Sequence, residues 1–504
     1  MPFILTMRPS ESCHYLAIDI GSTTVAAVII DLDSGTIVGS SSVANTAEIT
    51  STADRRIGRS EWDLEEMTEL AVNNAAALIM STSARPAAVG VTGQQQGLQL
   101  LDSDLRTVDR FISWQDQRSK EIVPGQKRTY LEMMADVGGA VVEAGGLPTF
   151  ENTGCPLVTG YTAPNLFWLQ ANNQLPTGVH ATTAPEFVVS RLTGERPVTD
   201  PTDALSWGVY DVVELNWDFD LVDRLGLDRS LLSNLAESCT RAGQITDRMA
   251  SKIGVQSGIP VSVASGDHQC SFAGTVADYA TTVAINVGTG GQTSVFIEES
   301  MPRGWLELRP FLQSGYLLAG VGVVGGRTFR TLRDFFSRTS SALAGQDLDP
   351  DLVYERLVEL AVEVPAGAEG VKFDPLFTGS RSNPLAKAAI RDLTPGTFTP
   401  GHLARALFEA MAAQLADSYR EALKLGASER TQLVGSGNGI RLNPVLRASL
   451  EQEFGMPTQL GPHTEEAAVG AALCAAVADG AFPSIGAASA AFVGHQHAEK
   501  GNEQ

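Results

Sequence analysis

Two stretches of this chain end in glycine- and hydroxyl-rich turns, and the first of them carries a carboxylate. Residues 15–30 read YLAIDIGSTTVAAVII, so Asp19 interrupts an apolar strand just before the turn. A buried, unpaired carboxylate is costly, so Asp19 should meet a cation, a donor or water. Residues 284–297 (AINVGTGGQTSVFI) match residues 17–30 without gaps, with Asn286 in place of Asp19. We interpret the match as an internal duplication in which only the first copy carries the charge suited to a hard cation.

Turns of this kind predict anion binding. Their backbone N–H groups can point inwards at a phosphate, glycine allows the backbone to approach closely, and hydroxyl side chains add donors. A third loop, GSGNG at 435–439, follows a short strand and suits a base or ribose better than a catalytic group. Each turn alone is more often an ordinary hairpin, but together the three favour a nucleotide-binding protein. The sequence has neither a Walker motif nor a protein-kinase catalytic loop, which disfavours P-loop chemistry.

The elements that must position these turns alternate between strand-like and helix-like runs, which predicts layered α/β architecture. Helices are expected over 63–79 and over 403–423, where apolar residues recur at a spacing of four. Polar loops at 93–97 and 114–118 each follow an apolar run. Because ligands of open α/β sheets lie beyond the carboxyl ends of strands, these loops are candidate site loops. A strand that ends in the loop SGDHQ indicates a second domain beginning near residue 258.

Composition excludes several classes of protein. The chain has 504 residues and a net charge of −22, which predicts several domains and argues against a nucleic-acid partner. No apolar run reaches 18 residues, so neither a spanning helix nor a membrane partner is expected. Five scattered cysteines predict neither a disulfide framework nor a zinc site and favour a reducing cytoplasm. We expect a flexible lead over 1–14, which is a poor signal peptide, and a flexible tail over 491–504.

The chain resembles the FGGY family of carbohydrate kinases, within the actin-like ATPase superfamily, over nearly its whole length. The order and spacing of the motifs carry the resemblance: LAIDIGSTT at 16–24, GQQQG at 93–97, WQDQR at 114–118, RLTGE with TDALSWGVYD at 191–211, SGDHQCSFAGT at 265–275, NVGTGG at 286–291, GSGNG with NPVLR at 435–447, and EEAAVGAAL at 465–473. The resemblance implies two ribonuclease-H-like domains around a central cleft that closes over ATP, Mg²⁺ and a sugar or polyol. Residues 15–257 would form the sugar-binding domain and residues 258–490 the nucleotide-binding domain, with a hinge near 255–262.

The resemblance also implies roles for individual residues. Asp267 would be the general base that accepts the proton of the attacking hydroxyl, and Asp19 would serve Mg²⁺ directly or through water. The residues implied to lie near the nucleotide are Gly21, Ser22, Thr23, Thr24, Gly288, Thr289, Gly290, Gly326, Gly435, Ser436, Gly437 and Asn443. Two alternatives stay open: Asp267 as a helix N-cap or loop carboxylate, and Asn443 as the N-cap of a helix that starts at Pro444. The acidic pair Glu465–Glu466 is interpreted as the first turn of a helix.

The positions that contact the acceptor in the family are Gln95, Gln96, Trp114, Asp116, Arg118, Asp267 and His268. Trp114 as a core residue and His268 as a bonded loop histidine are the structural alternatives. Xylulose kinases usually show Met-His, and glycerol kinases Arg-Glu, where this chain has Gln95–Gln96. The loop GDHQ and the segment GSGNG…NPVLR are more similar to sedoheptulose kinases, so a seven-carbon ketose is favoured. A xylulose, glycerol or polyol kinase, a non-catalytic sugar sensor and an actin-like ATPase remain alternatives, and a homodimer stays open.

Overall fold

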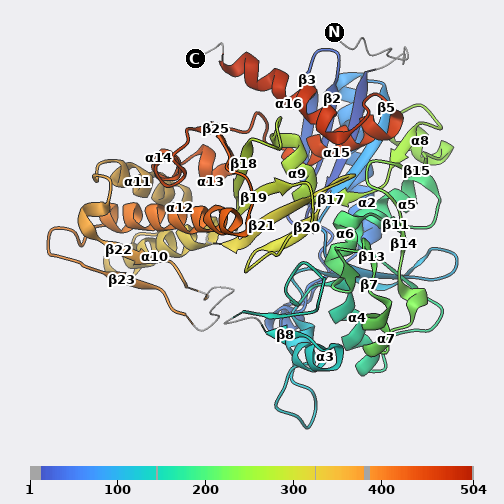
Figure 1. The fold of residues 1–504 in the computed structure, drawn as a ribbon, viewed down its shortest axis with the longest axis horizontal. Helices are drawn as coiled ribbons and strands as arrows, with labels where there is room; N and C mark the ends of the chain where they lie inside the picture. The colour runs from blue at the N-terminus through green and yellow to red at the C-terminus, as the bar shows by residue number, and fades with distance from the viewer. Residues whose placement is uncertain (1–12, 143–145, 324, 378, 380–385, 502–504) are drawn as a thin grey trace.

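The computed structural model describes residues 13–142, 146–323, 325–377, 379 and 386–501, and it contains two large mixed sheets (Figure 1). The first sheet has the order β15-β16-β5-β1-β2-β3, with β17 paired to β5. Its strands are β1 His14–Ile20, β2 Thr24–Asp31, β3 Thr36–Ala44, β5 Pro86–Gly93, β15 Arg241–Gln244, β16 Pro260–Ser262 and β17 Ser265–Gly266. The second sheet has the order β20-β21-β19-β18-β24-β25. Its strands are β18 Thr282–Val287, β19 Gly291–Ile297, β20 Glu307–Pro310, β21 Tyr316–Val323, β24 Gln432–Ser436 and β25 Thr458–Leu460.

The two sheets repeat the same arrangement, as the duplicated sequence predicts. In the first sheet β1 pairs antiparallel with β2 and parallel with β5. In the second sheet β18 pairs antiparallel with β19 and parallel with β24. Asp19 lies opposite Thr92 of β5, and Asn286 lies opposite Ser436 of β24, so the two residues hold equivalent places. The two hairpins therefore direct their turns and their polar strand ends at corresponding positions.

Helices α9 (Asp267–Thr275) and α15 (Glu466–Asp479) pack against each other between the sheets. Glycine makes this contact possible, because a Cβ at Gly470 would lie far inside contact distance of the Cys270 carbonyl oxygen. Alanine-rich α15 also packs on β1 and β5. Its buried small side chains share a core with Tyr15, Ala17 and the last helix, α16 (Ile485–Gly501). The C-terminal helices α15 and α16 thus pack on the first sheet.

The remaining elements surround these layers. The helix expected over 63–79 is α2 (Leu64–Thr82), capped by Asp63, and the helix expected over 403–423 is α12 (Pro400–Leu425). A smaller four-stranded sheet contains β4 Glu61–Trp62, β6 Gly97–Leu101, β7 Thr107–Ser113 and β10 His180–Thr182. The other helices longer than five residues are α3 Tyr130–Gly138, α4 Thr162–Ala171, α5 Ala184–Thr193, α7 Phe219–Arg224, α8 Asp247–Ile253, α10 Gly326–Ala344, α11 Pro350–Val362 and α14 Pro444–Phe454. No helix in the described part of the chain is both long and apolar enough to cross a bilayer.

The structure corrects two boundaries expected from the sequence. Residues 260–266 do not open the second domain, because β16 and β17 pair with β5 in the first sheet. The link between the sheets is α9 and the residues up to Thr282, so the boundary lies after the expected hinge near 255–262. The expected flexible tail from 491 instead continues α16, with Phe492 and Val493 buried. The expected lead over 1–14 lies outside the described residues except for residues 13 and 14, and His14 begins β1.

Candidate functional site

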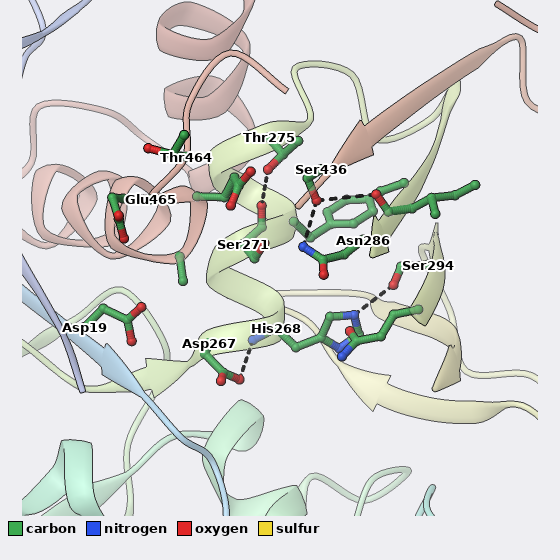
Figure 2. Close-up of a pocket in the computed structure, with 16 residues that line it drawn as sticks. Asp19, Asp267, His268, Ser271, Thr275, Asn286, Ser294, Ser436, Thr464 and Glu465 are labelled. Atoms are coloured by element: carbon green, nitrogen blue, oxygen red, sulfur yellow. Dashed lines mark hydrogen bonds between the residues drawn. The ribbon is translucent and has the colours of Figure 1, made fainter. Parts of the chain in front are cut away.

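A cavity of about 260 Å³ lies where α9 and α15 meet the two sheets (Figure 2). The strand ends of both repeats contribute to it, which is the place where α/β sheets bind ligands. Its polar lining residues are Asp19, Asp267, His268, Ser271, Thr275, Asn286, Gln292, Ser294, Ser436, Thr464, Glu465 and Glu466. The lining thus combines carboxylates from one side with amide and hydroxyl groups from the other.

Asp19 projects into this cavity from the end of β1. Among the residues that the structure describes, we find no hydrogen-bond donor to its carboxylate. Burial, together with the smaller effects of the neighbouring carboxylates of Asp267 and Glu465, raises the pKa of Asp19 to about 7. A carboxylate whose charge is disfavoured by two neighbouring carboxylates is suited to a hard cation, which prefers oxygen ligands. The carboxylate that interrupts the first strand therefore fits Mg²⁺ chemically.

Asp267 is the first residue of α9 and also faces the cavity. Its carboxylate accepts a hydrogen bond of 2.7 Å from the backbone N–H of His268. Gly266 rather than Asp267 is the N-cap, so helix capping does not account for this carboxylate. Burial raises the pKa of Asp267 to about 6, against the opposing effects of the His268 N–H and the Arg309 guanidinium. At neutral pH the carboxylate is ionised and can accept a proton.

Helix α6 (Pro201–Ala204) holds the strand that leads to Asp267. Thr202 Oγ1 accepts from the backbone N–H of Gly266 at 2.8 Å, and Asp200 accepts from the Ser265 hydroxyl at 2.8 Å. Thr202 begins the segment TDALSWGVYD that the family resemblance singled out, and Asp200 lies two residues before it. They do not line the cavity, so their contribution is to fix the backbone from which Asp267 projects.

Arg309 of β20 joins three groups around the base, and sequence reasoning missed it. Its guanidinium donates to Glu307 at 2.6 and 2.8 Å, to Gln95 Oε1 at 3.1 Å and to His268 Nδ1 at 3.1 Å. Arg309 and Glu307 are both buried, which strengthens the ion pair between them. Arg309, on the second sheet, thereby bonds both His268, which is next to Asp267, and Gln95 in the predicted acceptor loop of the first domain.

Gln95 and Gln96 were predicted to contact the acceptor, and the structure separates them. The Gln95 amide is fully engaged, because its nitrogen donates to Thr202 O at 2.8 Å and to Gln269 Oε1 at 2.9 Å while its oxygen accepts from Arg309. Gln96 is half-buried, and we find no hydrogen bond of its side chain within the described residues. The structure thus gives Gln95 a scaffold role, and Gln96 is the member of the pair that stays a candidate for acceptor contact.

Asp116 and Arg118 form an ion-pair network outside the lining of the cavity, and their acceptor contact stays a prediction. Asp116 is fully buried and accepts from Arg118 Nε and Nη2 at 2.9 Å and from the backbone N–H of Ser60 at 2.8 Å. Arg118 Nη2 also donates to Glu61 at 2.8 Å. These bonds hold both side chains in place, and Arg118 also lines a second, smaller pocket together with Glu61. Trp114 is 38% exposed, which excludes the core-packing alternative and leaves it as a predicted contact.

The predicted phosphate turns lie at the two hairpin tips. In the first turn Gly21 N–H donates to Thr24 O at 3.0 Å, and Asn45 donates to Gly21 O at 2.8 Å. In the second turn Gly288 O accepts from Gly326 N–H and Thr289 O accepts from Arg327 N–H, both at 2.9 Å. The start of α10 therefore packs directly on this turn, and the family-implied Gly326 is next to Gly288.

Of the residues predicted around the third loop, only Ser436 lines the cavity. Its hydroxyl accepts from Asn286 Nδ2 at 2.9 Å, which joins β18 to β24 at the cavity wall. Gly437 has φ +81 and lies against the Val287 carbonyl, so a side chain there would be both strained and crowded. Gly435, inside β24, contacts Ile440 and Thr458. Asn443 is buried and caps α14 by accepting from Leu446 N–H at 3.0 Å, so the capping alternative is confirmed.

Arg441 and Glu465 are two further residues that sequence reasoning did not place at the site. Arg441 donates to the carbonyl oxygens of Gly461 and His463 and to Glu466 at 3.1 Å, which fixes the segment before α15. Glu465, the N-cap residue of α15, then lies in the cavity near Asp19. The helix start predicted from Glu465–Glu466 is confirmed, but the acidic pair also contributes charge to the site. The spacing of residues in the sequence does not predict that this acidic pair contributes charge to the site.

Comparison with known proteins finds relatives along nearly the whole chain. The chain is 25% identical to the sedoheptulokinase of Mus musculus, covering 91% of this chain and 96% of that protein. It is 29% identical to the glycerol kinase of Dechloromonas aromatica, covering 94% and 90%. The crystal structure of xylulose kinase from Rhodospirillum rubrum superposes with a TM-score of 0.78 at 24% identity, covering 95% and 92%. This likeness shows the fold of two actin-like, ribonuclease-H-like domains.

Two family profiles cover most of the chain. The N-terminal domain of the FGGY family of carbohydrate kinases matches residues 14–274, and the C-terminal domain of the same family matches residues 284–478. The chain therefore belongs to the FGGY family of carbohydrate kinases, which are phosphotransferases acting on sugar hydroxyls.

Proposed function

We propose that this kinase transfers a phosphoryl group from Mg-ATP to a hydroxyl of a ketose such as sedoheptulose, with Asp267 as general base. The observation that carries the proposal is the pair of cavity carboxylates, Asp19 and Asp267, which have raised pKa values of about 7 and about 6 and lie where the two repeats meet. Asp19 is suited to binding a cation, and Asp267 is suited to accepting a proton. Phosphoryl transfer needs both kinds of help, since positioning and charge neutralisation dominate its catalysis.

In this proposal Asp267 accepts the proton of the attacking hydroxyl as transfer proceeds. Asp19 holds Mg²⁺ directly or through water, and Mg²⁺ would neutralise phosphate charge. The glycines of the second turn support a phosphate site there, because Gly288 and Gly290 have no crowding neighbour and no left-handed backbone that would demand glycine. The remaining reason for glycine at these two positions is that a ligand approaches the backbone closely. The turn of residues 21–24 and the loop of residues 435–437 would complete the nucleotide site.

The acceptor proposed here rests on resemblance and on the polar groups near Asp267. Proteins named sedoheptulokinase from Mus musculus and Homo sapiens are among the relatives, at 25% and 26% identity. Gln96 and Trp114 remain predicted contacts, and His268 stays one although its two ring nitrogens bond Arg309 and Ser294. A polyhydroxy substrate is recognised by polar side chains of this kind. Glycerol kinases and xylulose kinases are also among the relatives, so glycerol and xylulose are the alternative acceptors. A cytoplasmic location is part of the proposal and agrees with five free cysteines.

A panel of acceptors tests the proposal. ADP release would be measured with Mg-ATP and sedoheptulose, xylulose, ribulose, glycerol, gluconate and ribitol, each over a range of concentrations. We expect the highest kcat/KM with sedoheptulose. A higher value for another panel member would replace the proposed acceptor, and no stimulation by any of them would favour a sugar sensor or an ATPase without a sugar acceptor.

A further inference from the structure

A chain of hydrogen bonds runs from the second sheet to the residue beside the proposed base. It contains Glu307, Arg309, His268 and Ser294. His268 Nδ1 lies 3.1 Å from Arg309 Nη1, and His268 Nε2 lies 2.8 Å from the hydroxyl of Ser294 (Figure 2). The network passes from one sheet to α9 and back to β19 of the same sheet.

The chemistry of the groups fixes the direction of each bond. A guanidinium has only donors, so Arg309 donates and His268 Nδ1 must be the accepting, unprotonated nitrogen. The imidazole proton is then on Nε2 and is donated to the Ser294 oxygen. Burial and the adjacent Arg309 lower the pKa of His268 well below its ordinary value, which keeps the ring neutral and this tautomer in place.

Ser294 therefore retains its own hydroxyl hydrogen. Its side chain lines the cavity and is 3% exposed, and we find no second hydrogen-bond partner for it within the described residues. A buried hydroxyl that has already accepted one bond gains most from donating to a ligand. Ser294 thus presents a donor to the cavity from the side of His268.

We propose that Ser294 is a specificity-determining residue whose hydroxyl donates a hydrogen bond to a hydroxyl oxygen of the sugar. The proposal rests on the kinase reaction proposed above, in which the acceptor must touch Asp267. Ser294 bonds His268, the direct neighbour of Asp267, whereas Asn286 and Ser436 on the same sheet as Ser294 bond each other. Ser294 is thereby placed at the acceptor end of the cavity, and the chain from Glu307 to His268 orients it.

The test compares Ser294→Ala with Thr293→Val, a matched control on the same strand. Thr293 is also buried, but its hydroxyl donates to Leu415 O at 2.9 Å on the α12 side and does not line the cavity. We expect Ser294→Ala to raise KM for the best acceptor of the panel about 10-fold, which is the loss of one hydrogen bond to a bound hydroxyl. KM for Mg-ATP should stay within about twofold. Thr293→Val should leave both KM values within about twofold.

Two further variants separate donation from packing. Ser294→Thr keeps the hydroxyl and should restore the acceptor KM to within about threefold of the wild type. His268→Gln can still accept from Arg309 and donate to Ser294, so it should keep a lower acceptor KM than His268→Leu. Thermal unfolding of each variant shows whether it is folded, and the His268 pair supplies the answer if Ser294→Ala does not fold.

Equal acceptor KM values for Ser294→Ala and Thr293→Val would overturn the proposal. It would also be overturned if Ser294→Ala raised KM for Mg-ATP instead, since the donor would then face a phosphate. Failure of the kinase proposal itself is distinguishable, because the wild type would then release no ADP in response to any acceptor.

Discussion

At the scale of the residue, Asp19 and Asp267 would perform different tasks in the proposed reaction, although both are carboxylates in one cavity. Asp19 has carboxylates as its charged neighbours, and Asp267 has the Arg309 guanidinium and a backbone N–H. The difference leaves Asp267 easier to ionise than Asp19 in the unliganded protein. A base must be ionised before the reaction, whereas a metal ligand becomes so when the cation binds.

The acid limb of the pH profile should report Asp267. Because only the carboxylate can accept a proton and burial raises the pKa of Asp267 to about 6, kcat/KM for the sugar should fall as pH drops below about 6. If the base were an exposed aspartate, kcat/KM would stay unchanged down to about pH 4. Initial rates between pH 4.5 and 8.5 at fixed free Mg²⁺ measure the limb, and a constant kcat/KM down to pH 4.5 would speak against this assignment.

Asp19→Asn should stabilise the unliganded protein while it removes the magnesium-dependent activity. The pKa of Asp19 is raised to about 7 in the folded state, so the folded protein binds more protons than the unfolded chain between about pH 4 and 7. Ionisation of Asp19 therefore lowers the free energy of unfolding as pH rises through this window. Asparagine removes that loss, so the variant's Tm at pH 8 should be a few degrees higher, and the gain should vanish near pH 4.

Calorimetry or dye-based melting at both pH values checks this prediction. Asp223→Asn is the matched control, because Arg229 lowers the pKa of the exposed Asp223 and its loss should give no gain at pH 8. A variant of Asp19 that is less stable than the wild type at pH 8 would show that the carboxylate has a favourable partner in the unliganded protein.

At the scale of the element, the contact between α9 and α15 brings the carboxylates of Asp267 and Glu465 to the same cavity. Asp267 begins α9, and Glu465 caps α15 beside Asp19. Gly470 and Gly274 allow the two helices to approach at the backbone level. A change in their spacing would therefore move the base relative to the proposed cation site.

Gly470→Ala should reduce both stability and turnover. The new methyl group would overlap the carbonyl of Cys270, one turn after Asp267, and overpacking of this kind costs about 1–3 kcal/mol. Urea unfolding and kcat measure the two effects. Gly486→Ala on α16 is the control, because its nearest neighbour would be 3.7 Å from the new Cβ and the change should be neutral or slightly stabilising. Similar behaviour of the two variants would contradict this view of the helix contact.

The elements that the sequence predicts well are those with a local signal. The duplicated hairpins follow from two matching strings, α12 from its spacing of four and the N-cap of α14 from Asn443–Pro444. The placement of α15 and α16 on the first sheet follows from no local pattern, since their alanine-rich faces would suit either sheet. Their placement is decided by packing between small residues that lie hundreds of positions apart in the sequence.

At the scale of the whole molecule, the site depends on contacts between distant segments. Gln95 and Arg309 are 214 residues apart in sequence, and Arg118 and Glu61 are 57 apart. Sequence motifs correctly indicate Asp19, Asp267, His268 and Ser436 as cavity residues. They cannot show that Gln95 and Asp116 are already bonded within the protein, because a motif carries residue types and no bonding partners. Arg309 lies outside every motif, and Ser294 lies in the repeated stretch 284–297 without a feature that sets it apart.

Ligand binding should close the two domains over the cavity. Both repeats contribute polar groups to it, and a kinase must keep water from the phosphate that it transfers. Small-angle scattering should show a smaller radius of gyration with a non-hydrolysable Mg-ATP analogue and the best acceptor than without ligands. The Asp19→Asn variant should show a weaker change, and an unchanged radius in the wild type would contradict closure.

Acceptor-dependent ADP release by the wild type and by Asp267→Asn tests the central claim most directly. We predict that the wild type responds to a ketose and that the variant loses at least about 100-fold in kcat, as expected for a missing general base. The variant should still bind Mg-ATP with nearly unchanged affinity, because asparagine keeps the shape of the side chain. Retained acceptor-dependent turnover in Asp267→Asn would show that another group accepts the proton and would contradict the account.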